Sequence, residues 1–225
     1  MSADAVATAL SAVLAAPEDN AARLLLSRAL DAAGDARGEL IRLQLRRWSV
    51  GALEPEPREL ALLAAETGRW AAPLYSLGVR AVELFRGVPG GINMNINDFL
   101  TAGERIFELA PVRHLRLEGA PARCAELMRA PALARLHALS WCDAGLGDGE
   151  AELLAAAPAA GRLRWLDLGG NRIGPAGVGA LAASPHLGRL GFVSLRGNPG
   201  EPALPARWRA GATPPHPDRM ASRLP

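Results

Sequence analysis

The sequence of 225 residues predicts an α/β protein: a right-handed solenoid with short parallel strands on its concave side and helices on its convex side, capped by an N-terminal all-α module. Three observations support this fold class. A group of apolar residues recurs at a fixed interval in the second half of the chain, and the first half carries apolar residues at helical spacing. A composition of 49% hydrophobic and 21% charged residues is typical of globular proteins.

The pattern divides the chain into three parts. Residues 1–77 form the helical module, residues 78–198 form the solenoid, and residues 199–225 form a tail with seven prolines. We expect Arg207 and Trp208 to cover the last turn of the solenoid, because the apolar edge of a terminal unit would otherwise be wet. Beyond Gly211 we expect disorder.

The first part predicts four short helices. Apolar residues at helical spacing and breaking residues place them at 2–16, from the break at Pro17–Asn20 to Gly34, from about Arg37 to Trp48, and after Pro57. The inward residues expected in the second and fourth helices are Leu24, Leu25, Leu26, Leu30, Leu60, Leu62 and Leu63.

A less regular segment joins the helices to the repeats. Strand anchors are expected first at Val79, Val82 and Leu84. The run Pro89-Gly90-Gly91 indicates a turn, and the alternation of apolar residues with asparagines over 92–97 indicates a strand. A helix should follow from Asp98 to Leu109, and we interpret the whole segment as the first, irregular turn of the solenoid.

Two consecutive units of 27 residues, 136–162 and 163–189, share the same apolar spacing. A unit three residues shorter precedes them, and a further unit begins at Leu190. One such unit cannot bury its apolar edge alone, so the stacked units predict the solenoid. The aligned strand anchors are Val112/Leu115/Leu117, Leu136/Leu139/Trp141, Leu163/Leu166/Leu168 and Leu190/Val193/Leu195.

Each unit should turn after its strand and return through a helix. Asn171 and Asn198 are expected to cap the backbone at this turn. Ala120 and Ala144 occupy the matching place in the first two units, so a ladder of asparagine side chains would be interrupted there. Helix signals over 175–183 and after Asp148 complete the units.

The frame LxxLxLxxNxL formed by these residues resembles the leucine-rich repeat, in its ribonuclease-inhibitor-like subtype. The N-terminal part is similar to the bacterial repeat-companion domain, a helical module that precedes such repeats. This resemblance implies a cap on a repeat array and no defined activity. Arg28-Ala29 stands where that family usually has an Asp-Trp pair. The residues that carry the resemblance are Gly34, Asp35, Arg37, Gly38, Glu39, Ile41 and Gln44, followed by Phe85-Arg86-Gly87.

Charge and cysteine content exclude several classes of protein. The 25 basic residues are all arginine and nearly balance 23 acidic residues, which argues against a strongly steered nucleic-acid binder. Cys124 and Cys142 are too few for a disulfide framework. No basic leader is present at the start, and no run approaches the roughly 20 apolar residues of a membrane helix. We therefore expect a cytoplasmic protein without membrane contact.

The residues between the strand anchors should face the concave surface. Arg113, His137 and Arg164 are expected in one column, and Trp165 and Phe192 are expected as exposed neighbours in the next. Adjacent aromatics beside arginines are typical of protein interfaces. We therefore predict a non-enzymatic module, a monomer or part of a hetero-complex, that binds another protein without a cofactor, a metal or catalytic residues. The predicted contact residues are Arg113, His114, Arg116, His137, Arg164, Trp165, Asp167, Phe192, Ser194 and Arg196.

Two other functions stay open at this point. The same arginines and aromatics could bind single-stranded nucleic acid through ion pairs and base stacking, although the near-balance of charges makes this the weaker candidate. His114, His137, Cys142 and Asp167 share the concave side and could serve a Cys/His-dependent enzyme or a metal site, but no known catalytic spacing accompanies them. The helical module is either a second docking site or only a cover.

Overall fold

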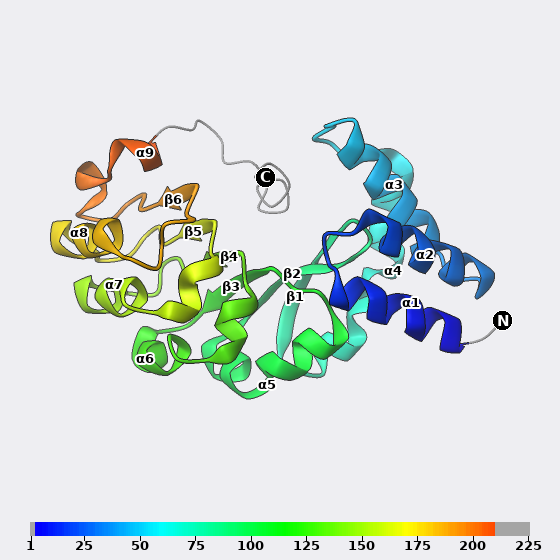
Figure 1. Cartoon of the computed structure of the whole chain (residues 1–225), viewed down its shortest axis with the longest axis horizontal. Coiled ribbons are helices and arrows are strands. Elements are labelled where there is room, and N and C mark those ends of the chain that lie inside the picture. The colour runs from blue at the N-terminus through cyan, green and yellow to red at the C-terminus, as the bar shows by residue number, and fades with distance from the viewer. Residues whose placement is uncertain (1–2, 210–225) are drawn as a thin grey trace.

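A computed structural model describes residues 3–209 and has the predicted α/β class. Across these residues it contains nine α-helices and one six-stranded sheet with the strand order β1-β2-β3-β4-β5-β6, which leaves β1 and β6 as edges. Helices α5 to α8 lie along one side of the sheet, with the N-terminal helices at one end and α9 at the other (Figure 1). Within residues 3–209, no helix has the length and apolar character needed to cross a membrane.

The N-terminal helices largely follow the predicted boundaries. Asp19 caps the N-terminus of α2, because its carboxylate accepts a hydrogen bond of 2.7 Å from the Ala21 amide. The fourth helix is longer than predicted, because the stretch around Trp70 continues it. The helices are α1 (Ala3–Ala15), α2 (Asn20–Ala32), α3 (Arg37–Ser49) and α4 (Pro57–Tyr75).

Three of the leucines predicted to face the core between these helices are exposed. Leu24 and Leu25 are 42% and 54% exposed, whereas Leu26 and Leu30 are buried. Leu60 is likewise 51% exposed. Consecutive helical residues are about 100° apart around the axis, so a run of three leucines cannot place all of them on one buried face.

The helices lead into an antiparallel hairpin formed by β1 (Val79–Phe85) and β2 (Val88–Asn95). Its two-residue loop is Arg86-Gly87, with φ angles of 48° and 81°, as a type I′ turn requires. The predicted turn at Pro89-Gly90-Gly91 is therefore wrong, because these residues belong to β2. The strand that pairs with the repeats is β2 and not the segment that begins at Val79.

The hairpin loop packs directly on the helical module. A Cβ atom at Gly87 would lie 2.1 Å from Cγ1 of Ile41, so only glycine allows this approach. The Gly87 amide donates a 2.6 Å hydrogen bond to Oε1 of Gln44 on α3. Val88 shares an apolar cluster with Leu26 and other residues of α1 to α3, so the core of the helical module extends past residue 77 into the hairpin.

The remaining strands run parallel to β2 and to one another. Leu115, Leu139 and Leu166 pair in register on β3, β4 and β5, and all three are fully buried, as the aligned anchors predict. On β2, Ile92 takes the matching place. These elements are α5 (Ile96–Leu109), β3 (His114–Glu118), α6 (Cys124–Leu127), β4 (Ala138–Ser140), α7 (Asp148–Ala155), β5 (Trp165–Asp167), α8 (Pro175–Ala183) and β6 (Phe192–Ser194).

Asparagine side chains join the last units, as predicted. Asn171 donates hydrogen bonds of 2.8 Å to the carbonyls of Trp141 and Leu168, and its Oδ1 accepts from the amides of Ala144 and Leu146 at 3.0 and 3.1 Å. Asn198 repeats the pattern one unit later. In the earlier units, where alanine replaces asparagine, the indole N–H of Trp141 donates to the Gly119 carbonyl at 3.0 Å.

The end of the described chain covers the last unit. After the 3₁₀ turn Glu201–Ala203, α9 (Ala206–Arg209) places Trp208 in the main core with 6% of its surface exposed. The Arg207 guanidinium donates to the Ala182 carbonyl at 2.8 Å. The predicted cover is thus confirmed, while the expected disorder beyond Gly211 lies outside the described residues.

Candidate functional site

The side of the sheet away from α5–α8 carries the predicted contact residues, and we call it the strand face. Its side chains form columns because β3 to β6 pair in parallel register. The predicted neighbours are confirmed, since Trp165 pairs with both Ala138 and Phe192. The two columns of the strand face are His114/Ala138/Trp165/Phe192 and Arg116/Ser140/Asp167/Ser194.

The aromatic pair of the strand face is stacked, with ring centroids 4.0 Å apart and planes at 29°. The expected exposure of Trp165 is wrong, because only 8% of its surface is accessible and the ring of Phe192 covers one of its faces. The Trp165 indole N–H is buried and has no hydrogen-bond partner among residues 3–209. Phe192 is half-buried, so it is the aromatic side chain that a partner can reach.

His114 is also buried rather than exposed, at 2%. Its Nε2 lies 3.0 Å from the hydroxyl oxygen of Ser140 on the neighbouring strand. A buried ring in this position supports the sheet and is not available as a surface contact.

A third column, just before the strands begin, contains Arg113, His137 and Arg164, as predicted. The His137 amide donates to the Arg113 carbonyl, and the Arg164 amide donates to the His137 carbonyl, each at 2.8 Å. The Arg113 guanidinium contacts the ring nitrogens of His137. Burial, with the charges of Arg113 and Arg164, lowers the pKa of His137 to about 4. The imidazole is therefore neutral near pH 7 and accepts from the guanidinium.

Glu18 connects the helical module to this column. From the turn between α1 and α2, its carboxylate forms an ion pair of 2.9 Å with Arg86 and lies 3.9 Å from Arg113. Burial alone would raise the pKa of Glu18, but the hydrogen bond and charge of Arg86 and the charge of Arg113 bring it below its ordinary value. The carboxylate thus stays ionised and holds the module against the sheet.

The arginines of the strand face differ in their partners. Arg116 forms an ion pair of 2.5 Å with Glu83 on the hairpin. Arg196 is exposed, and no residue within 3–209 forms an ion pair with it. It lies beside β6, where an open groove of about 770 Å³ follows the edge strand. This β6 groove is lined by Phe192, Ser194, Arg196, Asn198, Glu201 and Trp208, among others.

The surroundings of both cysteines disfavour the thiolate. Burial and the nearby Asp167 raise the pKa of Cys142 to about 11, and burial raises that of Cys124 to about 11 as well. Both are therefore protonated thiols near neutral pH, which speaks against a nucleophilic cysteine. Among residues 3–209, no three His, Cys, Asp or Glu side chains are grouped closely enough to hold a metal ion.

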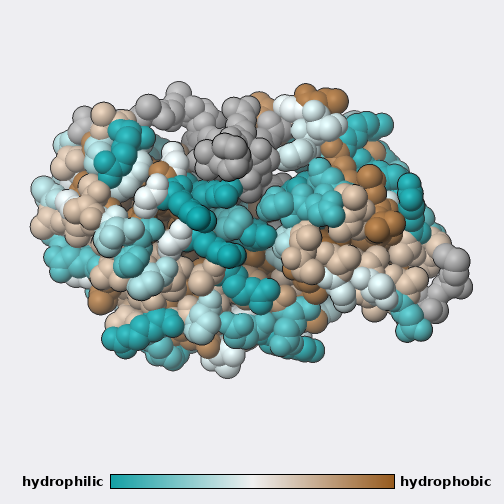
Figure 2. All heavy atoms as spheres, viewed as in Figure 1, coloured by the Kyte–Doolittle hydropathy of each residue, from teal (hydrophilic) through white to brown (hydrophobic). Residues whose placement is uncertain are grey.

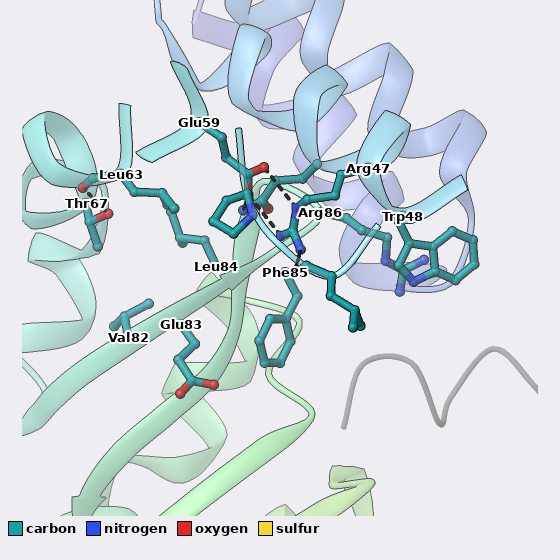
Figure 3. A pocket seen from close by; sticks show the side chains of 13 residues that line it. Arg47, Trp48, Glu59, Leu63, Thr67, Val82, Glu83, Leu84, Phe85 and Arg86 are labelled. Carbon is teal, nitrogen blue, oxygen red and sulfur yellow. Dashed lines mark hydrogen bonds and ion pairs between the residues drawn. The ribbon is translucent and has the colours of Figure 1, made fainter. Parts of the chain in front are cut away.

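A second hollow, which the sequence analysis missed, lies between α3, α4 and β1 (Figure 3). It has a volume of about 410 Å³, and Glu59 lies in its wall, fully buried. Both carboxylate oxygens of Glu59 accept hydrogen bonds from Arg47, each at 2.9 Å, and Oε1 also accepts from Gln44 at 3.0 Å. A carboxylate with its lone pairs occupied in this way fixes the helices and is poorly placed to move a proton.

A sequence signal for this hollow exists in hindsight. Glu59 lies three residues before Leu62 on the buried face of α4, and Gln44 lies three residues after Ile41 on the buried face of α3. Polar residues at core positions of two amphipathic helices indicate a buried hydrogen-bond network.

Comparison with known proteins adds no family. No protein-family model matches the chain, no curated protein matches it, and no solved structure matches it. The resemblance to the repeat-companion domain and to the leucine-rich repeat therefore stays a prediction, and the function has to be inferred from the geometry of the strand face and its borders.

Proposed function

We propose that this protein is a non-enzymatic interaction module, a leucine-rich-repeat solenoid capped by a helical module of the repeat-companion type, which binds a partner protein on its strand face. The repeated register of β3 to β6 and the asparagine bonds between units support the repeat assignment. The packing of the hairpin loop on Gln44 and Ile41 supports the cap assignment.

One observation carries the proposed binding role. At the β6 end of the strand face, Phe192, Ser194 and Arg196 line the open β6 groove. This arrangement offers an aromatic ring on a rigid stacked base, a hydroxyl and an unpaired guanidinium on one continuous surface. Aromatic and arginine side chains supply most of the binding energy in protein interfaces. A partner with an interface of standard size would cover about 800 Å² on this side.

The two alternative functions have weaker support. Stacking of successive bases needs several open aromatic faces, but Trp165 is 8% exposed and leaves only the half-buried Phe192 of the stacked pair within reach. Catalysis by cysteine and histidine needs groups that ionise near neutral pH, but Cys142 has its pKa raised to about 11 and His137 has its pKa lowered to about 4. The two cysteines are free thiols, which suits the reducing cytoplasm where we propose that the protein acts.

Site-specific photo-crosslinking tests this role without removing a structural side chain. Replacement of Ser194 by p-benzoylphenylalanine places the probe on the strand face, and the same replacement of Glu152, which is exposed on α7, places it on the opposite side. After irradiation of cells that express the protein, we expect one discrete cross-linked protein from Ser194 and none from Glu152.

A second measurement uses the cross-linked protein in purified form. Arg196→Glu should weaken its binding at least about tenfold, because reversing the charge of an interface residue costs more than about 1.4 kcal/mol of binding free energy. Glu152→Arg serves as the control and should leave the affinity unchanged. Cross-links from Glu152 alone, or an affinity that Arg196→Glu does not change, would show that the strand face is not the binding surface.

A further inference from the structure

Charge is separated across the sheet in the repeated part of the chain. The segments that enter β4, β5 and β6, residues 128–137, 155–164 and 183–191, contain no aspartate or glutamate. We call them the entry loops. Their five arginines and two histidines are Arg129, Arg135, His137, Arg162, Arg164, His186 and Arg189. The carboxylates of the same units lie farther along the chain: Asp167 ends β5, Asp143 follows β4, and Asp148 begins α7.

Three of these arginines occupy one repeated position. Arg135, Arg162 and Arg189 each precede a buried leucine whose amide donates to the carbonyl three residues back, at 3.0 to 3.1 Å. Because β4, β5 and β6 are adjacent and in register, the three arginines form a row along the edge of the sheet. We call this the arginine row. Neighbouring parallel strands are about 4.8 Å apart, so long guanidinium side chains in such a row can act on one ligand.

The side chains of the arginine row are exposed and carry uncompensated charge. Arg135 stacks over the ring of Phe107 at 4.6 Å, and none of the three arginines forms an ion pair with a residue in the range 3–209. The chain contains no lysine, so the choice of arginine carries no information by itself. The information lies in the repeated position and in the lack of acidic residues within the entry loops.

An open hollow of about 450 Å³ lies between two consecutive entry loops. Arg162, His186 and Arg189 line it, and the other lining residues are glycine and proline, so no carboxylate faces the two guanidiniums. Figure 2 shows a band of hydrophilic side chains across the middle of the molecule, over the part of the view where Figure 1 places β3 to β5.

The positive field also acts on neighbouring groups. Burial lowers the pKa of Arg113 below its ordinary value, and the charges of Arg162 and Arg135 add to this effect while Glu18 opposes it. The charge of Arg162 also contributes to the low pKa of His137. A region in which cations destabilise one another in the free protein favours an anionic ligand, because the ligand relieves that repulsion.

We propose that the arginine row binds an acidic, extended peptide segment of a partner protein. Alternate residues of an extended chain lie about 6.7 Å apart on one side, against about 4.8 Å between neighbouring strands, and the long arginine side chains can span the difference of about 2 Å, so successive carboxylates can meet successive guanidiniums of the row. The planar guanidinium matches a carboxylate in a two-point hydrogen bond. This inference goes beyond the proposed function, because the row lies at the edge of the sheet and does not require contact with Phe192 or Arg196.

The row favours a peptide over a nucleic acid. Sequence-independent binding of single strands combines phosphate contacts with stacking of bases on aromatic rings, and the strand face offers little surface for stacking because Trp165 is 8% exposed and Phe192 is half-buried against it. Asp167 and Glu118 on the strand face would repel a phosphate backbone that turned onto the sheet.

Fluorescence anisotropy with a labelled peptide of about ten glutamates tests the proposal, with a glutamine peptide of equal length as the ligand control. We expect the glutamate peptide to bind and the glutamine peptide not to bind. The double variant Arg162→Ala/Arg189→Ala should weaken binding about fivefold or more, since an exposed ion pair contributes up to about a fivefold change. The matched control Arg28→Ala/Arg172→Ala removes the same charge at exposed positions outside the row and should change the affinity less than twofold.

Three outcomes would overturn the proposal. The first is no binding of the glutamate peptide at low salt, and the second is equal weakening by the row variant and the control variant. The third is tighter binding of an oligothymidine of about ten nucleotides that the row variant abolishes, which would assign the row to nucleic acid. Cross-linking from Ser194 reports on the strand face alone, so failure of the row and failure of the proposed function give different results.

Discussion

Removal of the Asn171 side chain tests the bonds that join the repeated units. Asn171 is 5% exposed and forms five hydrogen bonds of 2.8 to 3.3 Å with the backbones of two successive units. In Asn171→Ala, the Trp141 carbonyl and the amides of Ala144 and Leu146 lose their partner in a place with little access to water, whereas the Leu168 carbonyl keeps its bond from Asn198. The variant should therefore fold with lower stability rather than with a different structure.

The magnitude follows from the three backbone groups that lose their partner. A hydrogen bond in a protein contributes about 0.5–1.5 kcal/mol net, and a buried group left unpaired costs about 1–3 kcal/mol. Allowing for partial relaxation, we expect Asn171→Ala to lower the free energy of unfolding by about 3–5 kcal/mol. That is a large share of the roughly 5–15 kcal/mol that stabilises a typical domain.

Urea denaturation measures the loss. With a slope of about 2–3 kcal/mol per molar urea, the midpoint should fall by about 1–2 M. Hydrogen exchange should also show faster exchange of the Ala144 and Leu146 amides, which donate to Asn171. Asn97→Ala, at an exposed position, is the control and should cost less than about 0.5 kcal/mol. A midpoint shift below about 0.3 M with unchanged amide exchange would refute the role assigned to Asn171.

Two further predictions concern the junction and the basic column. Gly87→Ala should destabilise the protein by at least about 2 kcal/mol in thermal unfolding, because the new Cβ would lie 2.1 Å from Cγ1 of Ile41. Gly51 also has a positive φ, but a Cβ there would meet no atom within 4 Å, so Gly51→Ala should cost less. Equal losses of stability in the two variants would refute the packing argument. The pKa of His137 is about 4 in the folded protein against about 6.5 in an unfolded chain. The contribution of neutral His137 to the free energy of unfolding is therefore complete above pH 6.5 and is lost as the pH falls toward 4. The loss should reach about 2–3 kcal/mol, and His137→Asn should flatten the dependence of stability on pH in that window; an unchanged slope would contradict the assigned pKa.

Sequence periodicity predicted the repeated part of the fold well. Leu115, Leu139 and Leu166 were aligned by spacing alone, and they pair in register with no exposed surface. The reason is physical, since units that stack must place equivalent side chains in one core. The hairpin was predicted less well, because Arg86 adopts a positive φ that is rare outside glycine, asparagine and aspartate. The nearby run Pro89-Gly90-Gly91 is a stronger turn signal in the sequence, but these residues belong to β2.

The candidate site was predictable in its columns and not in its exposure. Register places Trp165 beside Phe192, but only the three-dimensional packing decides that one ring covers the other. The charge separation of the entry loops was present in the sequence and needed the strand boundaries to become visible. The hollow beside Glu59 depends on a contact between α4 and β1, and spacing along the chain does not predict such contacts.

The matching register and asparagine bonds of the last two units suggest a way to lengthen the sheet by whole units. Asn171 bonds to the unit before residues 163–189, and Asn198 bonds in the same way to residues 163–189. A duplicate of this segment inserted after Arg189 would therefore meet matching surfaces on both sides. Each inserted copy would bring one more strand, one more asparagine and one more member of the arginine row. In a series of proteins with increasing numbers of inserted copies, the length of the acidic peptide that binds most tightly should increase with each copy.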